Sequence, residues 1–177
     1  SDKFDSVDSM NSVKGAYQQL IRILKKKGMK RFAIISPTPN HGRSHIIQEV
    51  LNEEGLIFAP EYLEWANSRK TAKEAMMKFL LLKKRPEVIL CNNDMLAVSA
   101  MATAIANGVK VPAEMKFIGN DGTDEAEFTY PPLTTLREPV EQITNELLRL
   151  LFRRIKDRKA KVINVAIEPT ILIRDSI

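Results

Sequence analysis

The sequence contains very little cysteine, histidine or tryptophan: its 177 residues include one Cys, two His and one Trp. A single cysteine excludes an internal disulfide framework and fits a reducing compartment. No apolar run approaches the roughly 18 residues that a membrane-crossing helix needs. A basic segment followed by an apolar one, as in a signal peptide, does not open the sequence. We therefore expect a cytoplasmic protein without a membrane partner.

The remaining composition is that of a globular protein, with 44% hydrophobic and 28% charged residues. The length suits one domain or two small lobes. The net charge of +5 is concentrated in residues 25–31, 83–85 and 149–161. Each cluster falls at the end of an expected helix, where cations complement the helix dipole. This placement favours solvated helix ends over a nucleic-acid surface.

Apolar periodicity predicts alternating helices and strands. Helices are expected over residues 12–27, 42–52, 71–84, 94–107 and 139–157, and strands over 32–35, 56–63, 88–91, 115–119, 162–167 and 170–173. The runs at 32–35 and 88–91 are continuously apolar, which is typical of strands covered on both faces. Repeated strand–helix units predict an α/β fold, with a parallel sheet and helices on both faces.

The first and last expected helices lie outside the compact strand–helix set of residues 31–121. Together with the two closing strands, they resemble pieces of a second lobe whose own strands are mostly absent. We infer, as a hypothesis, that the sequence is part of a longer gene product.

Polar side chains follow three of the expected strands, in the loops at 36–43, 92–94 and 119–122. In a parallel sheet, ligands bind at the carboxyl ends of the strands. Asparagine both donates and accepts hydrogen bonds, aspartate accepts them from hydroxyls, and arginine donates a planar fork. This set suits a neutral polyhydroxyl ligand, and Trp65 could offer it a flat apolar face.

Structural interpretations of the same residues remain open. Asp94 could equally cap its helix, and residues 120–122 (NDG) could form an ordinary turn. A lone tryptophan such as Trp65 is more often a core or rim residue than a stacking platform. The convergence of three loops at one sheet edge favours a binding role.

Catalysis and metal binding have little support. His41 and His45 are four residues apart and could share a helix face, but no third histidine exists, so a surface pair is the favoured interpretation. Cys91 ends an apolar run and is interpreted as a core residue. Nucleophile-elbow, Walker-type and dinucleotide-binding motifs are absent. We expect no enzyme activity, no metal and no cofactor.

Several segments resemble, in order, the effector-binding core of LacI/GalR-type transcriptional regulators. They are residues 28–35 (GMKRFAII), 85–94 (RPEVILCNND), 108–112 (GVKVP), 117–122 (FIGNDG), 131–139 (PPLTTLREP) and 169–176 (PTILIRDS). The segment at 131–139 is the most specific of these. The resemblance covers essentially the whole sequence.

The resemblance implies a type I periplasmic-binding-protein-like fold, in which two α/β lobes hold a sugar or nucleobase between them. Residues 30–137 and 169–177 would form most of the C-terminal lobe. Residues 1–29 and 138–168 would be elements of the N-terminal lobe. The DNA-binding helix-turn-helix head would lie outside this sequence.

By position, the resemblance also implies a set of ligand-binding residues. Arg43 matches the family's cleft arginine, and Asp121 matches its cleft aspartate. Asn93 and Asp94 match its "ND" pair, and Trp65 lies about two residues from a position that is often aromatic. Glu138 replaces a common glutamine near the hinge.

The implied function is effector sensing by ligand-dependent lobe closure, with a small molecule such as a sugar as effector. The implied partners are operator DNA, contacted through a segment absent from this sequence, and a second copy in a homodimer. One alternative is the sugar-binding receptor of an ABC-type transporter. Another is a sugar-processing enzyme that would use Asp94 and Asp121 as its acid and base.

Overall fold

Six strands form the main sheet of the computed structural model, which describes residues 9–10, 13–39, 41–56 and 58–177. Their order across the sheet is β3 (Leu63–Trp65), β2 (Phe32–Ser36), β4 (Val88–Cys91), β5 (Lys116–Asp121), β6 (Thr134–Arg137) and β8 (Thr170–Leu172). The strands from β3 to β6 pair in parallel, whereas β8 pairs antiparallel with β6. The expected α/β class with a mostly parallel sheet is confirmed.

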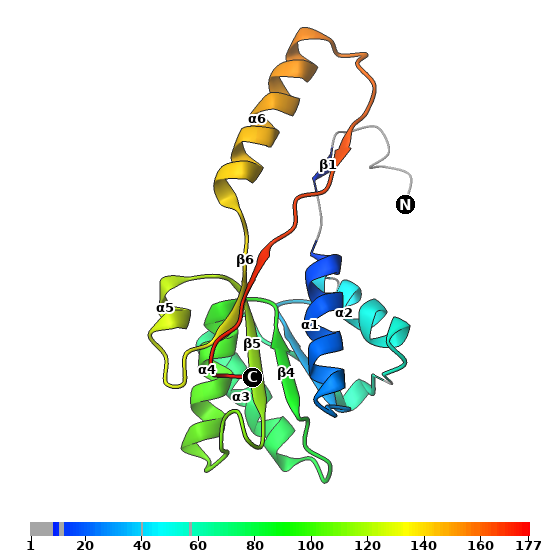
Figure 1. Ribbon diagram of the computed structural model, residues 1–177. Coiled ribbons are helices and arrows are strands. Elements are labelled where there is room, and N and C mark those ends of the chain that lie inside the picture. The colour runs from blue at the N-terminus through cyan, green and yellow to red at the C-terminus, as the bar shows by residue number, and fades with distance from the viewer. Residues whose placement is uncertain (1–8, 11–12, 40, 57) are drawn as a thin grey trace.

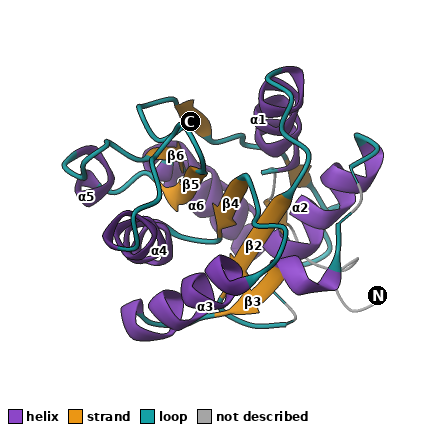
Figure 2. Cartoon of the chain, turned by 90° about the horizontal axis from the view of Figure 1, so that it is seen from below, coloured by secondary structure: helices purple, strands orange, loops and turns teal. Residues whose placement is uncertain are grey.

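Helices cover both faces of this sheet (Figure 2). One face carries α1 (Lys14–Lys26) and α2 (Gly42–Glu53), and the other carries α3 (Arg69–Leu81) and α4 (Asp94–Ala106). Side chains alternate between the two faces along a strand. In β2, accordingly, Phe32 and Ile34 pack toward α1 and α2, whereas Ala33 and Ile35 pack toward α3 and α4. The apolar run at 32–35 is continuous because both faces are buried.

The edge next to β2 differs from the expected strand at 56–63. A short 3-10 helix, Pro60–Tyr62, occupies part of that range, and β3 begins only at Leu63. Proline has no N–H to donate to a neighbouring strand but fits the first position of a helix, so Pro60 begins the helical turn instead. The next helix starts at Arg69, two residues earlier than expected, because Ser68 and Thr71 form a capping box before it.

Helix α1 packs against the large sheet, which differs from the expected assignment of residues 1–29 to the N-terminal lobe. Its apolar side chains Tyr17, Leu20, Ile21 and Leu24 are buried with residues of β2, β4 and α2. The amphipathic face of α1 explains this position, since the same helix presents charged residues to solvent. Ser12, where the expected helix begins, lies outside the described residues.

A second, smaller unit projects from the carboxyl-end edge of the sheet (Figure 1). It contains the long helix α6 (Val140–Lys156) and a parallel pair formed by β1 (Ser9–Met10) and β7 (Asn164–Val165). Strand β6 leads into it and β8 returns from it. Many apolar side chains of α6 are exposed: Leu147, Leu148, Leu151, Phe152 and Ile155. Within the described residues, no helix combines the length and apolar character needed to span a bilayer.

Candidate functional site at the carboxyl ends of the strands

Arg43 lies at the centre of a polar cluster at the carboxyl ends of the strands. It belongs to the first turn of α2, directly after the β2 loop. Its Nη1 donates to the main-chain oxygen of Asn92 at 2.5 Å and lies 3.8 Å from Oδ1 of Asp121. Its Nη2 lies 3.4 Å from Oε1 of Glu138. One guanidinium therefore connects the loops after β2, β4, β5 and β6.

The main chain of Asp121 turns sharply at the end of β5. Asp121 has a φ of 125°, which is unusual for any residue other than glycine, and Gly122 follows with a φ of 69°. A Cβ at Gly122 would overlap the main chain and side chain of Arg137. Strained backbone of this kind is concentrated at binding and catalytic sites. Here it accompanies a carboxylate that is about half exposed, at 45%.

A buried hydrogen-bond relay holds the Asp121 carboxylate from behind. The phenol of Tyr17 donates to Oδ1 of Asn120 at 3.2 Å, and Nδ2 of Asn120 donates to Oδ1 of Asp121 at 3.1 Å. Tyr17 and Asn120 are both buried. Burial raises the pKa of Tyr17 well above its usual range, so its hydroxyl remains a donor. The other oxygen of Asp121 is not used in this relay.

The ionisation of Asp121 reflects two opposing influences. Burial raises the pKa of the carboxyl, whereas the Asn120 hydrogen bond and the Arg43 guanidinium lower it. The nearby carboxylates of Asp94 and Glu138 raise it again. The net pKa is above that of an ordinary aspartate. A bound hydroxyl that donates to the ionised carboxylate would therefore compete with protonation.

A second buried network connects Asn92 to the β2 loop. Nδ2 of Asn92 lies 2.9 Å from Oγ of Ser44, 3.2 Å from Oγ of Ser36 and 2.8 Å from Nδ1 of His41. The amide nitrogen can only donate, so Nδ1 of His41 accepts. This fits a His41 pKa that is lowered by burial and by Arg43.

The side-chain carbonyl oxygen of Asn92 differs from the amide nitrogen in its hydrogen bonding. Oδ1 of Asn92 is buried and accepts no hydrogen bond from the residues described. Leaving a buried acceptor unmatched costs about 1–3 kcal/mol. A rearrangement that supplies a donor at this point would be favourable.

Asp94 has a position different from the one expected of a ligand-binding residue. Its side chain is fully buried between α4, β6 and the loop after β5. Oδ1 accepts from Oγ1 of Thr135 at 2.5 Å, and Oδ2 accepts from both N and Oγ1 of Thr123, at 2.7 and 3.0 Å. A Cβ at Gly119 would overlap Oδ1. This carboxylate therefore ties the loop after β5 to β6.

Asn93 and Trp65 lie at the same sheet edge, outside the Arg43 cluster. Asn93 caps α4, because its Oδ1 accepts from the N–H of Leu96 at 2.9 Å. Trp65 ends the edge strand β3, in register with Ser36, and is 39% exposed. The structure thus brings Arg43, Asp121 and Glu138 together. It leaves Asn93 in a capping role and Trp65 at the rim.

Asn120 belongs to the polar loop predicted at 119–122, whereas nothing in the sequence pointed to Tyr17 as its partner. They are 103 positions apart, and only the packing of α1 on the sheet brings them together. Asn92 belongs to the predicted loop at 92–94, but its buried network depends on Ser44, which lies in the first turn of α2. No pattern in the local sequence indicates any of these contacts.

His41 and His45 lie one turn apart at the start of α2, where the N–H of His45 donates to the main-chain oxygen of His41 at 3.4 Å, but their side chains have different surroundings. His45 is exposed on α2, whereas His41 faces Asn92. Burial raises the pKa of the Cys91 thiol far above its usual range. In the part of the protein that the structure describes, no three His, Cys, Asp or Glu residues are grouped as a metal site.

A hollow of about 790 Å³ lies directly beyond this cluster, between α6 and the β7 strand. Pro139 and Val140 border it at the start of α6, and residues 165–167 form its opposite wall. Glu138 belongs to the polar cluster and Pro139 borders the hollow. The two are therefore adjacent where the chain passes from β6 into α6.

The mostly parallel sheet, the helices on both of its faces and the polar edge at the carboxyl ends of its strands define one lobe of a periplasmic-binding-protein-like α/β fold. The sequence profile of the periplasmic binding protein-like domain matches residues 21–177. The chain therefore belongs to the periplasmic binding protein-like domain family, within which it carries the effector-binding core of LacI-type regulators.

Known proteins agree with this assignment. The HTH-type transcriptional repressor PurR of Mannheimia succiniciproducens is 32% identical over 130 residues, which are 73% of this chain and 39% of that protein. A LacI transcriptional regulator from Bacillus cereus subsp. cytotoxis superposes with a TM-score of 0.90 at 18% identity, covering 99% of this chain and 64% of that one. A transcriptional regulator CelR–cellobiose complex has a TM-score of 0.86 at 22% identity, covering 97% and 54%.

The relatives also bear on the expected activity and on the length of the chain. They are transcriptional regulators and not enzymes. The alternative of a transporter receptor is not favoured by them. The chain spans 39% of the length of the PurR of Mannheimia succiniciproducens and 51% of that of the PurR of Histophilus somni.

Proposed function

We propose that this chain is the effector-sensing part of a LacI-type transcriptional regulator, which responds to a small molecule by a change in lobe angle. The observation that carries the proposal is the position of Arg43. Its guanidinium contacts Asn92 and lies near Asp121 within the large lobe, and it also reaches Glu138, where the chain leaves that lobe.

A ligand at this edge would compete for the same groups. Hydroxyls that donate to Asp121 and accept from Arg43 would weaken the contact between Arg43 and Glu138. Because Glu138 immediately precedes α6, that contact depends on the angle between the two units. A ligand that binds one angle better shifts the population toward it. A coupling of about 1–3 kcal/mol to operator affinity is sufficient for regulation.

The ligand class that fits this edge is a neutral, hydroxyl-rich molecule such as a sugar. The edge offers the Arg43 guanidinium and the half-exposed Asp121 carboxylate, which together pair with ligand hydroxyls that accept and with ligand hydroxyls that donate. The cellobiose complex of the regulator CelR, with the same fold, supports this choice. Trp65 would contact the apolar face of a sugar ring from the rim, and Asn93 and Asp94 would hold the loops that position Arg43 and Asp121.

The remaining functions are proposed for the native protein, because its relatives are longer than this chain. The exposed apolar side chains of α6 would be covered by further strands of a second lobe, to which residues 138–168 would belong. Operator DNA would be bound through another segment, in the cytoplasm and as a homodimer. These steps follow the relatives, which are HTH-type transcriptional repressors by name.

Operator binding by the full-length native protein tests the proposed function. Sugars, amino sugars and nucleosides would first be screened for an increase in melting temperature. We expect that one of them changes operator affinity at least about fivefold, the lower limit of typical allosteric coupling. If a tightly bound small molecule leaves operator affinity unchanged, or if turnover of that molecule is observed, the proposal is wrong.

As the pH is lowered, the affinity for the effector is expected to begin to fall at a higher pH than it would if the site held an ordinary aspartate, whose pKa is about 3.9. Burial raises the pKa of Asp121, so the carboxyl gains its proton, and loses its negative charge, at a higher pH. The same shift means that the folded protein binds more protons than the unfolded chain in this range, so ionisation of Asp121 lowers stability as pH rises. Calorimetric titrations from about pH 4 to pH 7 would measure the affinity.

Asp121→Asn is the control for this pH dependence, because the amide does not titrate. Its effector affinity should be lower than that of the wild type at neutral pH and nearly constant across the range. A wild-type affinity that is equally flat would remove Asp121 from the binding site.

A further inference from the structure

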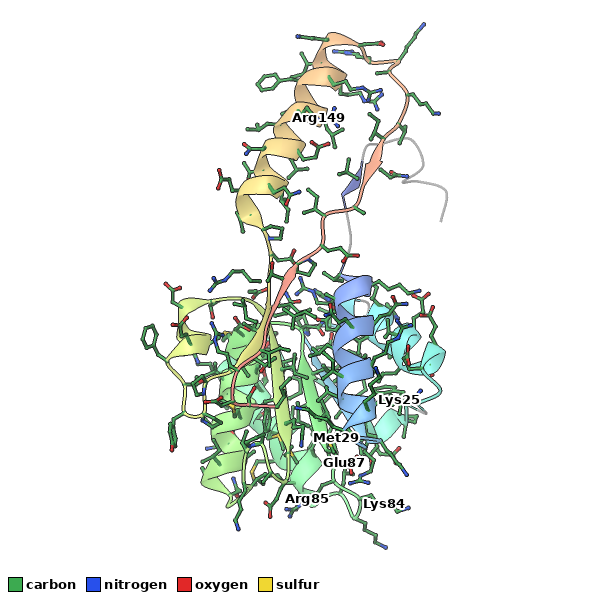
Figure 3. The ribbon with its side chains drawn as sticks, in the orientation of Figure 1. Lys25, Met29, Lys84, Arg85, Glu87 and Arg149 are labelled. Carbon is green, nitrogen blue, oxygen red and sulfur yellow. The ribbon has the colours of Figure 1, made fainter. Side chains whose placement is uncertain are left out.

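Basic residues that are far apart in the sequence meet at the amino ends of the strands. Residues 25–27 end α1, residues 30–31 precede β2, and residues 83–85 connect α3 to β4. Figure 3 shows Lys25, Lys84 and Arg85 at the same end of the main lobe, opposite Arg149 on α6. In the sequence each cluster is explained by its own helix end. The fold combines them into one surface.

This surface contains a groove of about 1020 Å³. Five cationic side chains line it, with two carboxylates, Glu61 and Glu114, among them. The cations are Lys30, Arg31, Lys83, Lys84 and Arg85. The groove also has apolar walls: Ala59, Leu82, Val109 and Met115. It is therefore both cationic and partly apolar.

Most of this positive charge is not neutralised within the described residues. Arg31 pairs with Glu87 at 2.8 Å. Lys30, Lys83 and Lys84 form no side-chain ion pair with any residue that the structure describes, and all three are exposed. The pKa of nearby Lys116 is lowered by burial and by the charge of Lys27. The surface thus repels further cations and attracts anions.

We propose that this amino-end groove, lined by Lys30, Arg31, Lys83, Lys84 and Arg85, binds an acidic polypeptide segment of another protein. The free lysines on its rim would pair with carboxylates, and its apolar walls would hold an aliphatic side chain of the same segment. Such a combination of charged rim and apolar centre is typical of protein interfaces.

A polypeptide fits this groove better than a nucleic acid does. Single-stranded nucleic acids bind by stacking their bases on exposed aromatic rings. The aromatic ring in the groove belongs to Tyr62, which is buried and whose hydroxyl donates to the main-chain oxygen of Lys84 at 2.8 Å. It therefore has no free face for stacking. An apolar wall also has no partner on a phosphate backbone.

The groove and the Arg43 cluster lie at opposite ends of the same parallel strands. Arg31 immediately precedes β2, whereas Arg43 lies in the first turn of α2, the helix that follows β2. A protein segment in the groove would leave the effector edge open. This inference therefore stands independently of the proposed effector function.

Binding of a defined peptide to the full-length native protein would test this surface. The probe is a fluorescein-labelled peptide of glutamates with a leucine at every fourth position, followed by fluorescence anisotropy at low ionic strength. The variant is K83E/K84E. The control is K70E/K73E, which makes the same charge change on exposed residues of α3 outside the groove. Melting temperatures verify that both variants fold.

We expect K83E/K84E to weaken peptide binding at least about tenfold, because two attractive contacts become repulsive. K70E/K73E should change it less than about twofold, through the long-range field alone. An all-glutamate peptide of the same charge should bind more weakly than the leucine-containing one.

Three results would overturn the proposal. One is equal loss of affinity in both double variants, which would indicate a non-specific field. Another is equal affinity for peptides with and without leucine. A third is displacement of the peptide by a single-stranded oligonucleotide of the same charge at lower concentration, which would make nucleic acid the ligand of the groove.

Discussion

Replacing Asp121 by Gly is expected to weaken effector binding at least about 100-fold while the lobe stays folded. Two hydrogen bonds from ligand hydroxyls to an ionised carboxylate contribute about 1.5–3 kcal/mol each, and the glycine makes neither. Glycine also adopts the φ of 125° at this position without strain. Isothermal calorimetry with the effector found by screening would measure the affinity.

Two further variants separate binding from folding at Asp121. Asp121→Ala should lose the same affinity but melt at a lower temperature than Asp121→Gly, because its Cβ disfavours a positive φ. Asp175→Gly removes an exposed aspartate elsewhere and should bind the effector as the wild type does. Unchanged affinity in Asp121→Gly would remove this carboxylate from the proposed site.

Replacing Asp94 by Ala is expected to lower the free energy of unfolding by about 2–6 kcal/mol, because the buried Thr135 hydroxyl loses its acceptor at about 1–3 kcal/mol and the two part-buried hydrogen bonds from Thr123 contribute about 0.5–1.5 kcal/mol each. Three donors, from Thr123 and Thr135, would lose their acceptor. For a domain of this size, about 1 kcal/mol changes the melting temperature by about 2–4 °C. Denaturant unfolding followed by circular dichroism would measure the loss.

Asp94→Asn is the matched variant for this carboxylate. The amide keeps one acceptor oxygen and nearly the same shape, so its loss of stability should be clearly smaller than that of Asp94→Ala. If Asp94 were instead a ligand contact, Asp94→Ala would bind the effector poorly yet unfold at the wild-type denaturant concentration. That pattern would contradict the structural role.

The strands of the core could be predicted because each is a short run of consecutive apolar residues, which is visible in the local sequence. The runs at 32–35 and 88–91 are continuously apolar, and the structure buries both on two faces. The expected strand at 56–63 was wrong because one residue, Pro60, cannot donate to a ladder and begins a helical turn. The side of the sheet on which α1 packs is likewise set by distant partners that its own sequence does not identify.

The loops of the candidate site could be predicted, but the roles of the individual residues in them could not. The rule that ligands bind at the carboxyl ends of parallel strands selects the loops of Arg43 and Asp121, which the structure brings within 3.8 Å. Glu138 was selected only by the family resemblance, and the structure places it 3.4 Å from Arg43. The rule could not distinguish Asp94 from Asp121. The difference between them lies in Thr123 and Thr135, which are 29 and 41 positions from Asp94. Burial of an acidic residue is a property of the packed lobe.

The antiparallel pairing of β6 with β8 has a mechanical consequence. These two strands are the outgoing and returning connections between the sheet and the α6 unit, and they are hydrogen-bonded from Thr135–Leu172 to Arg137–Thr170. Two unpaired linkers could rotate independently of each other. Two hydrogen-bonded strands move together, so the pair can bend perpendicular to its plane but resists rotation of one strand relative to the other. The α6 unit should therefore bend about this ribbon more readily than it twists, and Glu138, the first residue after the outgoing strand β6, lies at the end of the ribbon that faces the α6 unit.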